Sequence, residues 1–267
     1  DSREYGNINP GARTIVAYNT DSHVIPVVRS NGILLAQVAP SGGVISGTSS
    51  VVQLDAWNWE DAAYKADQGI HMSWPRMTDT GRRSTYAAMM RSRPGSNYED
   101  TFKELDKLFK DATAYAALEV VEKKNLKLEA LGGLFTGEKT LFINISDAKS
   151  IMASYEFARK HGVKKVVMVN AGESAWMVKD YIKENNIPLI LASIHSMPAY
   201  EHSDTRLPFK LAKMFHDEGI LVGITFPGAA SAYNLPFVAG QAVAYGLPEE
   251  EALAMITLNN AKILGVD

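Results

Sequence analysis

The feature that most constrains the fold is a regular alternation of short apolar strands and helices from residue 140 to the carboxyl end. The pattern predicts strands at 141–145, 165–169, 187–194 and 220–226, each followed by a helical stretch. These strands are apolar throughout, which is typical of a sheet covered by helices on its faces. Strict strand and helix alternation indicates right-handed βαβ units and a parallel sheet. The chain is therefore of the α/β class.

The remaining elements are predicted from apolar spacing and from residues that begin or end helices. Asp147 is placed to cap a helix that Gly162 ends, and further strands are predicted at 33–39 and 70–73. The segment 99–124 carries apolar residues at helical spacing with acids and lysines on the other face, so we predict a long amphipathic helix. It could bind a partner, but packing on its own barrel is the favoured interpretation. The other predicted helices are 175–184, 207–217, 233–245 and 249–264.

Six strands joined by helices leave two architectures, an open doubly wound sheet or a (β/α)8 barrel. A dinucleotide fold would show a glycine fingerprint directly after its first strand, with an acid about 20 residues further on, and no such fingerprint occurs. The glycine-rich run 40–47 follows a strand but lacks the Gly-Lys-Ser/Thr ending of a phosphate-binding loop, so it is interpreted as a loop. We predict a (β/α)8 TIM-type barrel that is incomplete in this chain, because two strands are not found.

Composition excludes several classes of partner and site. The 267 residues carry a formal net charge of -3, which gives no broad positive field for phosphate backbones or anionic lipid. No apolar run approaches the ~20 residues that span a bilayer. The chain has no cysteine, which excludes disulfides, thiolate metal sites and a cysteine nucleophile. We expect no nucleic-acid or membrane partner, a small-molecule ligand, and a soluble protein of the cytoplasm or the periplasm.

In a parallel barrel the active site lies at the carboxyl ends of the strands. The side chains predicted there are Pro40, Ser41, Ser73, Trp74, Asn144, Ser146, Asn170, His195, Thr225 and Phe226. A hydrolytic zinc needs imidazole or carboxylate ligands to lower the pKa of a bound water, and this set holds one histidine. His195 is thus the candidate catalytic residue, and Ser73, Trp74 and Thr225 are candidate pocket residues. No metal or other cofactor is predicted from these residues.

Other chemistry is poorly supported by the residues. The six histidines show no His-x-His or His-Glu-x-x-His spacing, and no Gly-x-Ser-x-Gly elbow is present. His71 is interpreted as a satisfied core residue inside a strand, and Glu173 as an acid at the start of a helix. A weaker interpretation is a sugar- or nucleoside-binding barrel in which tryptophans stack on a ring, and the candidates are Trp57, Trp59 and Trp74.

Three stretches resemble a known family. They are PGARTIVAYN at 10–19, the segment 25–63 that contains LDAWNWED, and NLPFVAGQAVAYGLPEEEALAMITLNNAKILGVD at 234–267. They are similar to imidazolonepropionase-like members of the metal-dependent amidohydrolase superfamily, and the similarity extends over nearly the whole chain. This resemblance implies a (β/α)8 barrel with a metal centre that activates water to cleave C–N bonds.

The resemblance also implies a ligand pattern that this sequence does not keep. The family's first-strand His-x-His has no counterpart, and its fifth-strand histidine falls on Asn144 in LFINIS. Its sixth-strand histidine falls on Asn170 in VVMVNAG, and its eighth-strand aspartate falls near Phe226 or Pro227. An amide oxygen is a weak neutral donor compared with imidazole, and without the aspartate the metal-bound water would lack its base.

Two functional hypotheses follow. The favoured one is a degenerate amidohydrolase-like barrel that is non-catalytic or of altered activity. The alternative is an active hydrolase of amide, cyclic amide or dipeptide-like bonds, whose zinc or other divalent metal is held by residues outside this segment or whose chemistry has moved to His195. Residues 1–267 would form most of one barrel domain with a helical insertion near 99–136, and the first strand and a flanking β-domain would lie outside it. A homo-oligomer or a complementary segment that completes the barrel is the expected assembly.

Overall fold

The computed structural model describes residues 5–75, 98–118, 120, 123–145, 147–192, 194–226 and 228–267. Within these residues one sheet holds seven strands in chain order. The strands are β1 (Leu35–Val38), β2 (Ile45–Gln53), β3 (Ala63–Ser73), β4 (Thr140–Asn144), β5 (Val166–Ala171), β6 (Leu189–Ala192) and β7 (Val222–Thr225). Strands β3 to β7 are parallel, whereas β2 runs antiparallel to both β1 and β3.

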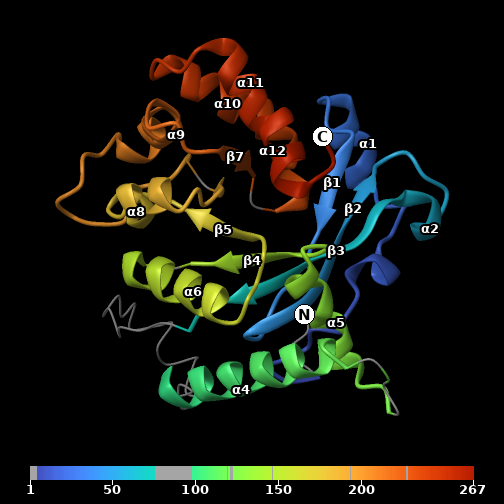
Figure 1. Ribbon diagram of the computed structural model, residues 1–267. Coiled ribbons are helices and arrows are strands. Elements are labelled where there is room, and N and C mark those ends of the chain that lie inside the picture. The colour runs from blue at the N-terminus through green and yellow to red at the C-terminus, as the bar shows by residue number, and fades with distance from the viewer. Residues whose placement is uncertain are drawn as a thin grey trace, which may run out of the picture.

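The strand order distinguishes the two architectures that the sequence leaves open. A doubly wound sheet reverses its order at a switch point, whereas consecutive neighbours are the rule in a barrel. Here each parallel strand pairs with the next one along the chain. The sheet is curled into part of a barrel, and Figure 1 shows α4, α6, α8, α9 and α11 following one another around it in chain order. An incomplete TIM-type barrel fits this arrangement.

The helices lie before, between and after the strands. They are α1 (Val24–Ser30), α2 (Trp59–Ala62), α4 (Tyr98–Ala116), α5 (Leu126–Thr136), α6 (Ala148–Lys160), α7 (Glu173–Trp176), α8 (Lys179–Glu184), α9 (Leu207–Asp217), α10 (Leu235–Ala244), α11 (Glu249–Ile256) and α12 (Leu258–Leu264), with 3-10 turns at Thr14–Ala17 and Ala229–Asn234. Asp147 caps α6 as predicted, because its Oδ1 accepts a hydrogen bond from the Ser150 backbone N at 2.9 Å. No helix among the described residues is long and apolar enough to cross a membrane.

Both faces of the parallel strands are packed. Ile143 of β4 belongs to the main core between sheet and helices, whereas its neighbour Phe142 belongs to a second core on the other face. That second core includes Ile263 of α12, so the last helix covers part of the inner face of the curled sheet. Burial on both faces explains why the predicted strands are apolar runs without polar alternation.

Strand β2 is the element that apolar patterning does not predict, since the glycine-rich run 40–47 favours a loop. In the structure, residues 45–47 already belong to β2. Gly47 has a positive φ of 138°, and a Cβ there would lie 2.4 Å from the backbone oxygen of Ala12. Small residues in this strand thus admit the close approach of the preceding chain, and they also hide the strand from a search for apolar runs.

Several helices also differ from prediction. The predicted helix 99–124 ends at Ala116, and a second helix, α5, follows. Leu105, Phe109 and Ala112 of α4 are fully buried in the main core, which supports packing on its own barrel over partner binding. The predicted helix 249–264 is broken at Thr257, and the predicted helix 175–184 is divided into α7 and α8.

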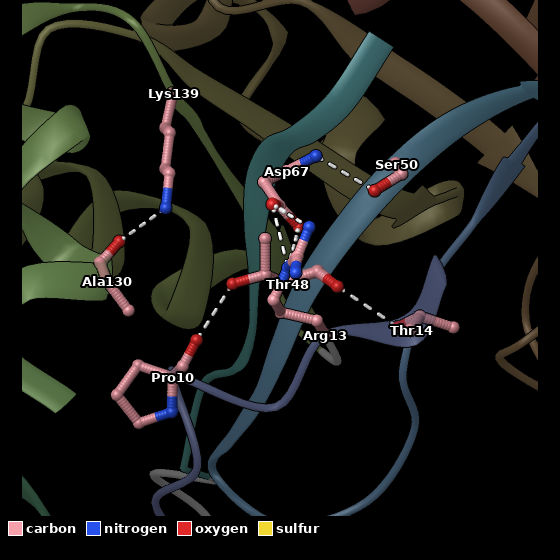
Figure 2. Close-up of polar contacts among 8 residues, drawn as sticks. All are labelled: Pro10, Arg13, Thr14, Thr48, Ser50, Asp67, Ala130 and Lys139. Atoms are coloured by element: carbon pink, nitrogen blue, oxygen red, sulfur yellow. Dashed lines mark hydrogen bonds and ion pairs between the residues drawn. The ribbon is translucent and has the colours of Figure 1, made fainter. Parts of the chain in front are cut away.

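A polar cluster joins the amino-terminal segment to the start of the parallel sheet (Figure 2). The Arg13 guanidinium contacts the Asp67 carboxylate, with Nη2 and Oδ2 2.7 Å apart. Asp67 has a positive φ of 52°, and its backbone N donates to Ser50 Oγ at 2.8 Å. The cluster therefore fixes an irregular point in β3 just before the strand begins to pair with β4.

Lys139 extends this polar cluster toward α5. Its Nζ donates a hydrogen bond to the Ala130 backbone oxygen at 2.8 Å (Figure 2). Burial lowers the pKa of Lys139, while the nearby Asp67 carboxylate acts in the opposite direction. The amino end of the parallel sheet thus combines charged groups with tight packing.

Candidate functional site

The carboxyl ends of β3, β4 and β5 bring three predicted site residues to one edge of the sheet. Ser73 and Asn144 are register partners at the ends of β3 and β4. Asn170 lies near the end of β5, and its side-chain Nδ2 donates a hydrogen bond to Asn144 Oδ1 at 2.7 Å. The two positions to which the resemblance assigns metal-binding histidines are thus in direct contact.

Local backbone geometry explains an asparagine at position 170. Asn170 has a φ of 60°, and the register between β5 and β6 shifts between Val169 and Ala171. The residue therefore forms a bulge in the left-handed region, which asparagine tolerates better than most residues do. The bulge lets the Asn170 amide reach back to β4, where it meets Asn144. The two side chains form a neutral hydrogen-bonded pair, termed the amide pair.

His71 lies one layer below the amide pair, on the same face of β3 as Ser73. Its ring stacks on Phe142 of β4, with centroids 4.9 Å apart and an interplanar angle of 12°. Burial lowers its pKa to about 4 from an ordinary value of 6.5, so the imidazole is neutral at pH 7. Among the described residues, its Nε2 has no hydrogen-bond partner. The prediction of a buried core histidine is confirmed, but the prediction that its hydrogen bonds are satisfied is wrong.

Trp74 and Phe226 turn toward the main core. The Trp74 ring is 4 % exposed and lies edge-on to Phe157 of α6 at 5.4 Å between centroids. Phe226, directly after β7, is half-buried and packs against the same core. Thr225 ends β7 and pairs with Ala192 of β6. Ser146, residue 193 and residue 227, which also follow strands of the sheet, lie outside the described residues.

His195 occupies a different environment from the amide pair. It is exposed in the segment after β6, and its ring lies edge-on to Phe209 of α9 at 5.6 Å between centroids. No hydrogen bond joins it to the amide pair within the part of the chain that the structure describes. The catalytic role that the sequence suggested for His195 remains a prediction.

Glu173 shapes the chain that follows β6. It is the first residue of α7, as the sequence suggested, and it is buried. Its Oε1 accepts a hydrogen bond from the Ala199 backbone N at 2.7 Å, and its Oε2 accepts one from Ser203 Oγ at 2.8 Å. Both oxygens therefore hold the segment that carries His195. This second role cannot be predicted from local patterns, because the partners lie 26 and 30 residues away.

The residues at these strand ends do not fit the hydrolytic metal that the resemblance implies. Asn144 and Asn170 present amides where imidazoles are expected, and Asn144 Oδ1 already accepts a hydrogen bond from its neighbour. Within the described ranges, no group of three or more His, Asp, Glu or Cys side chains could hold a metal ion. The neutral amides and hydroxyls found here can instead donate and accept hydrogen bonds with a polar ligand.

Comparison with known proteins supports the fold. The structure of an amidohydrolase from Thermotoga maritima MSB8 matches with a TM-score of 0.81 at 18% sequence identity, over 99% of this chain and 70% of that one. A second amidohydrolase matches 54% of this chain and 38% of its own, with a TM-score of 0.35 at 13% identity, and is too distant to carry an argument. No protein-family model and no curated protein matches the sequence. The chain has an amidohydrolase-like fold, and a fold alone does not assign a reaction.

Proposed function

We propose, from this amidohydrolase-like fold, that the chain forms most of a barrel domain whose carboxyl-end site binds a small polar molecule without a metal-activated water. In this proposal the protein is a non-catalytic or altered-activity relative of the imidazolonepropionase-like enzymes. The supporting observation is the amide pair. Its 2.7 Å hydrogen bond joins the two side chains at the positions to which the resemblance assigns metal-binding histidines.

The chemistry of the amide pair supports binding more than hydrolysis. Each amide offers one acceptor oxygen and one nitrogen donor group, and the Asn170 to Asn144 hydrogen bond leaves further donors and acceptors available. A cyclic amide, a urea or a sugar presents the complementary neutral groups. Hydrolysis would need a group to activate water, and neither amide can take up a proton at neutral pH.

The proposal includes an assembly in which a complementary segment extends the sheet at β7. Strand β7 is an edge of the seven-stranded sheet, and the side chains of Asn259 and Asn260 donate to two of its backbone oxygens. The acceptors are Val222 O at 2.8 Å and Ile224 O at 3.0 Å. These bonds occupy backbone acceptors that would otherwise be open to unspecific pairing at the edge. A strand that completes the barrel would replace the two asparagine side chains as hydrogen-bond donors to β7. The segment around 99–136 would be a helical insertion of the same domain.

Metal analysis and a turnover screen test the catalytic part of this proposal. The purified protein is incubated with zinc, manganese or iron, separated from free metal, and assayed against amides, cyclic amides and dipeptides. We expect less than one bound metal per chain and no turnover. Stoichiometric metal together with activity that chelation removes would reject the proposal in favour of the alternative, an active metal-dependent hydrolase.

A ligand screen tests the binding part. Thermal shifts are measured with cyclic amides, ureas and sugars, and each stabilising compound is tested again on Asn144→Ala and on the control Lys103→Gln, an exposed residue of α4. A ligand of the carboxyl-end site should stabilise the control and wild type equally, and Asn144→Ala less. Equal stabilisation of all three proteins by every hit would contradict a site at the amide pair.

A further inference from the structure

A second concave region lies at the opposite end of the parallel strands. It is a cavity of about 310 Å³ where β4 and β5 begin, lined also by the residues that precede β6 and β7. The carboxyl-terminal part of α6 and the end of α12 complete its wall. We term it the basic cavity. It is separate from the amide pair because the two regions lie at opposite ends of the same strands.

The charges around this cavity have one sign. Its lining includes four cationic residues and, among the described residues, no Asp or Glu. The four are Arg159, Lys164, Lys165 and Lys262. None of them takes part in an ion pair found within the described part of the chain, whereas the neighbouring Lys160 contacts Asp106 at 2.9 Å. Unpaired cations around a concave surface concentrate a positive potential there, although the chain as a whole is slightly acidic.

Part of this lining is held in place before any ligand arrives. Arg159 Nη1 donates to Asn185 Oδ1 at 3.3 Å, and the guanidinium carbon lies 6.0 Å from the centroid of the Tyr155 ring. Tyr155 itself donates from its hydroxyl to the Asn185 backbone oxygen at 3.2 Å. A guanidinium has five N–H donors, so Arg159 keeps donors for an oxyanion while these contacts orient it.

Helix dipoles explain the positions of only two of the four cations. Arg159 and Lys262 stand in the last turns of α6 and α12, where the carboxyl end of a helix attracts positive charge. Lys164 and Lys165 lie between α6 and β5, outside any helix. All four side chains are exposed, and the described lining holds no carboxylate. An anionic ligand would supply opposite charge there.

We propose that the basic cavity binds a small polyanion that carries two or more phosphate or carboxylate groups. Four cations call for more than one negative charge, and the volume fits a small molecule better than a polymer. The formal net charge of -3 argues against an extended nucleic-acid surface at this place. This site is independent of the proposed function of the carboxyl-end site.

Isothermal titration calorimetry with two probes tests the polyanion site on the full chain. Pyrophosphate represents phosphate ligands and tricarballylate represents carboxylates, both titrated at about 0.15 M salt, where exposed charges are screened. We expect at least one probe to bind wild type with unit stoichiometry, and the tighter probe identifies the ligand class. If neither probe binds, the proposal is wrong.

A pair of matched double variants locates the binding. Arg159→Gln with Lys262→Gln removes two cations of the cavity, and Lys103→Gln with Lys107→Gln removes two exposed cations of α4. The cavity variant should bind at least about tenfold more weakly, because hydrogen bonds to charged groups have about this effect, while the control should stay within about twofold of wild type. Equal affinities of the two double variants would overturn the proposal.

A single variant covers the case in which the cavity double variant does not fold. Lys165 is exposed and outside the helices, so Lys165→Gln should keep the wild-type circular dichroism spectrum. It should weaken probe binding about threefold or more. Unchanged affinity in a folded Lys165→Gln variant would count against the polyanion site.

Discussion

The polar side chains that end β3 to β5 are neutral, and the carboxylates of Asp147 and Glu173 just beyond them are engaged in hydrogen bonds, whereas the amino ends of the parallel strands carry charged groups. The carboxyl end presents the amide pair and Ser73. The amino end carries the Arg13 to Asp67 ion pair, the half-buried Lys139 and the basic cavity. In a catalytic barrel the reactive charges are expected at the carboxyl end. The strand ends of this chain present neutral amides and a hydroxyl instead, on an amidohydrolase-like fold.

The two ends of the strands also differ in the space around one glycine at each end. A Cβ on Gly69, where β3 begins to pair with β4, would lie 2.4 Å from the Phe142 ring. A Cβ on Gly172, just after β5, would meet no atom within 4 Å. The sheet is thus tightly packed where β3 begins to pair with β4, whereas a side chain just after β5 would have space. The following predictions test this contrast and the one in charge.

The largest effect is expected from His71, which lies between the two ends. Its pKa is about 4 in the folded chain and 6.5 ordinarily, so the unfolded chain binds the proton more tightly. Stability should therefore fall as pH falls from 6.5 to 4, by about 3 kcal/mol at the lower limit. His71→Leu should lack this part of the pH dependence while remaining as stable as wild type at pH 7, because the unpartnered Nε2 is removed.

Urea unfolding of both proteins from pH 7 to pH 4 measures this difference. The control is His202→Leu, since His202 is an exposed residue of the chain after β6. It should keep the wild-type pH profile. An identical profile for His71→Leu and wild type would mean that His71 is not neutral and buried in the folded protein.

The packing contrast predicts a large effect at one glycine and a small one at the other. Gly69→Ala should lower the free energy of unfolding by about 2 kcal/mol, because the fully buried Phe142 ring cannot move aside without disturbing β4. Gly172→Ala should change it by about 0.5 kcal/mol or less. Chemical denaturation of the two variants measures both values, and equal losses would remove the packing difference between the ends.

Much of the fold could be predicted because it depends on local patterns. The apolar runs of β4 to β7 and the Asp147 cap of α6 follow from hydrophobic burial and from short-range hydrogen bonding. Strand β2 could not be predicted from apolar spacing, because it begins with small and polar residues and its Gly47 serves a long-range contact, the approach of Ala12. The break at Thr257 was missed for a similar reason, since α11 and α12 both contact β7 and the sequence shows no proline or glycine there.

The site was predicted less completely than the fold. Strand ends placed Ser73, Asn144 and Asn170 at one edge, as parallel pairing requires. The orientation of Trp74 into the core could not be predicted, because it depends on Phe157 of a helix more than 80 residues later, and neither could the two long-range hydrogen bonds of Glu173. The basic cavity could not be predicted either, since Lys262 comes from α12 and only folding brings it to the three lining cations of 159–165.

A smaller effect is expected from the Arg13 to Asp67 ion pair at the amino end. Asp67→Asn keeps a residue that tolerates the positive φ and removes the charge. Because the Arg13 and Asp67 side chains are 46% and 29% exposed, solvent screens the pair and the loss of stability should be about 1 kcal/mol or less. The loss should shrink in 1 M salt. A loss that is independent of salt would mean that Asp67 stabilises the local backbone conformation and not the ion pair with Arg13.

The smallest effect on stability is expected at the amide pair, where a binding role predicts little contribution to folding. Asn170→Gly keeps the left-handed backbone at φ 60° and removes the hydrogen bond to Asn144, so it should cost about 0.5 kcal/mol in this exposed position. Asn170→Ala removes the same bond but strains the backbone, which should add about 1 kcal/mol. Chemical denaturation gives both values, and their difference is the cost of placing a side chain in the left-handed backbone conformation at position 170. A loss above about 2 kcal/mol for Asn170→Gly would show that the amide pair holds the sheet together, and would contradict its assignment to ligand binding.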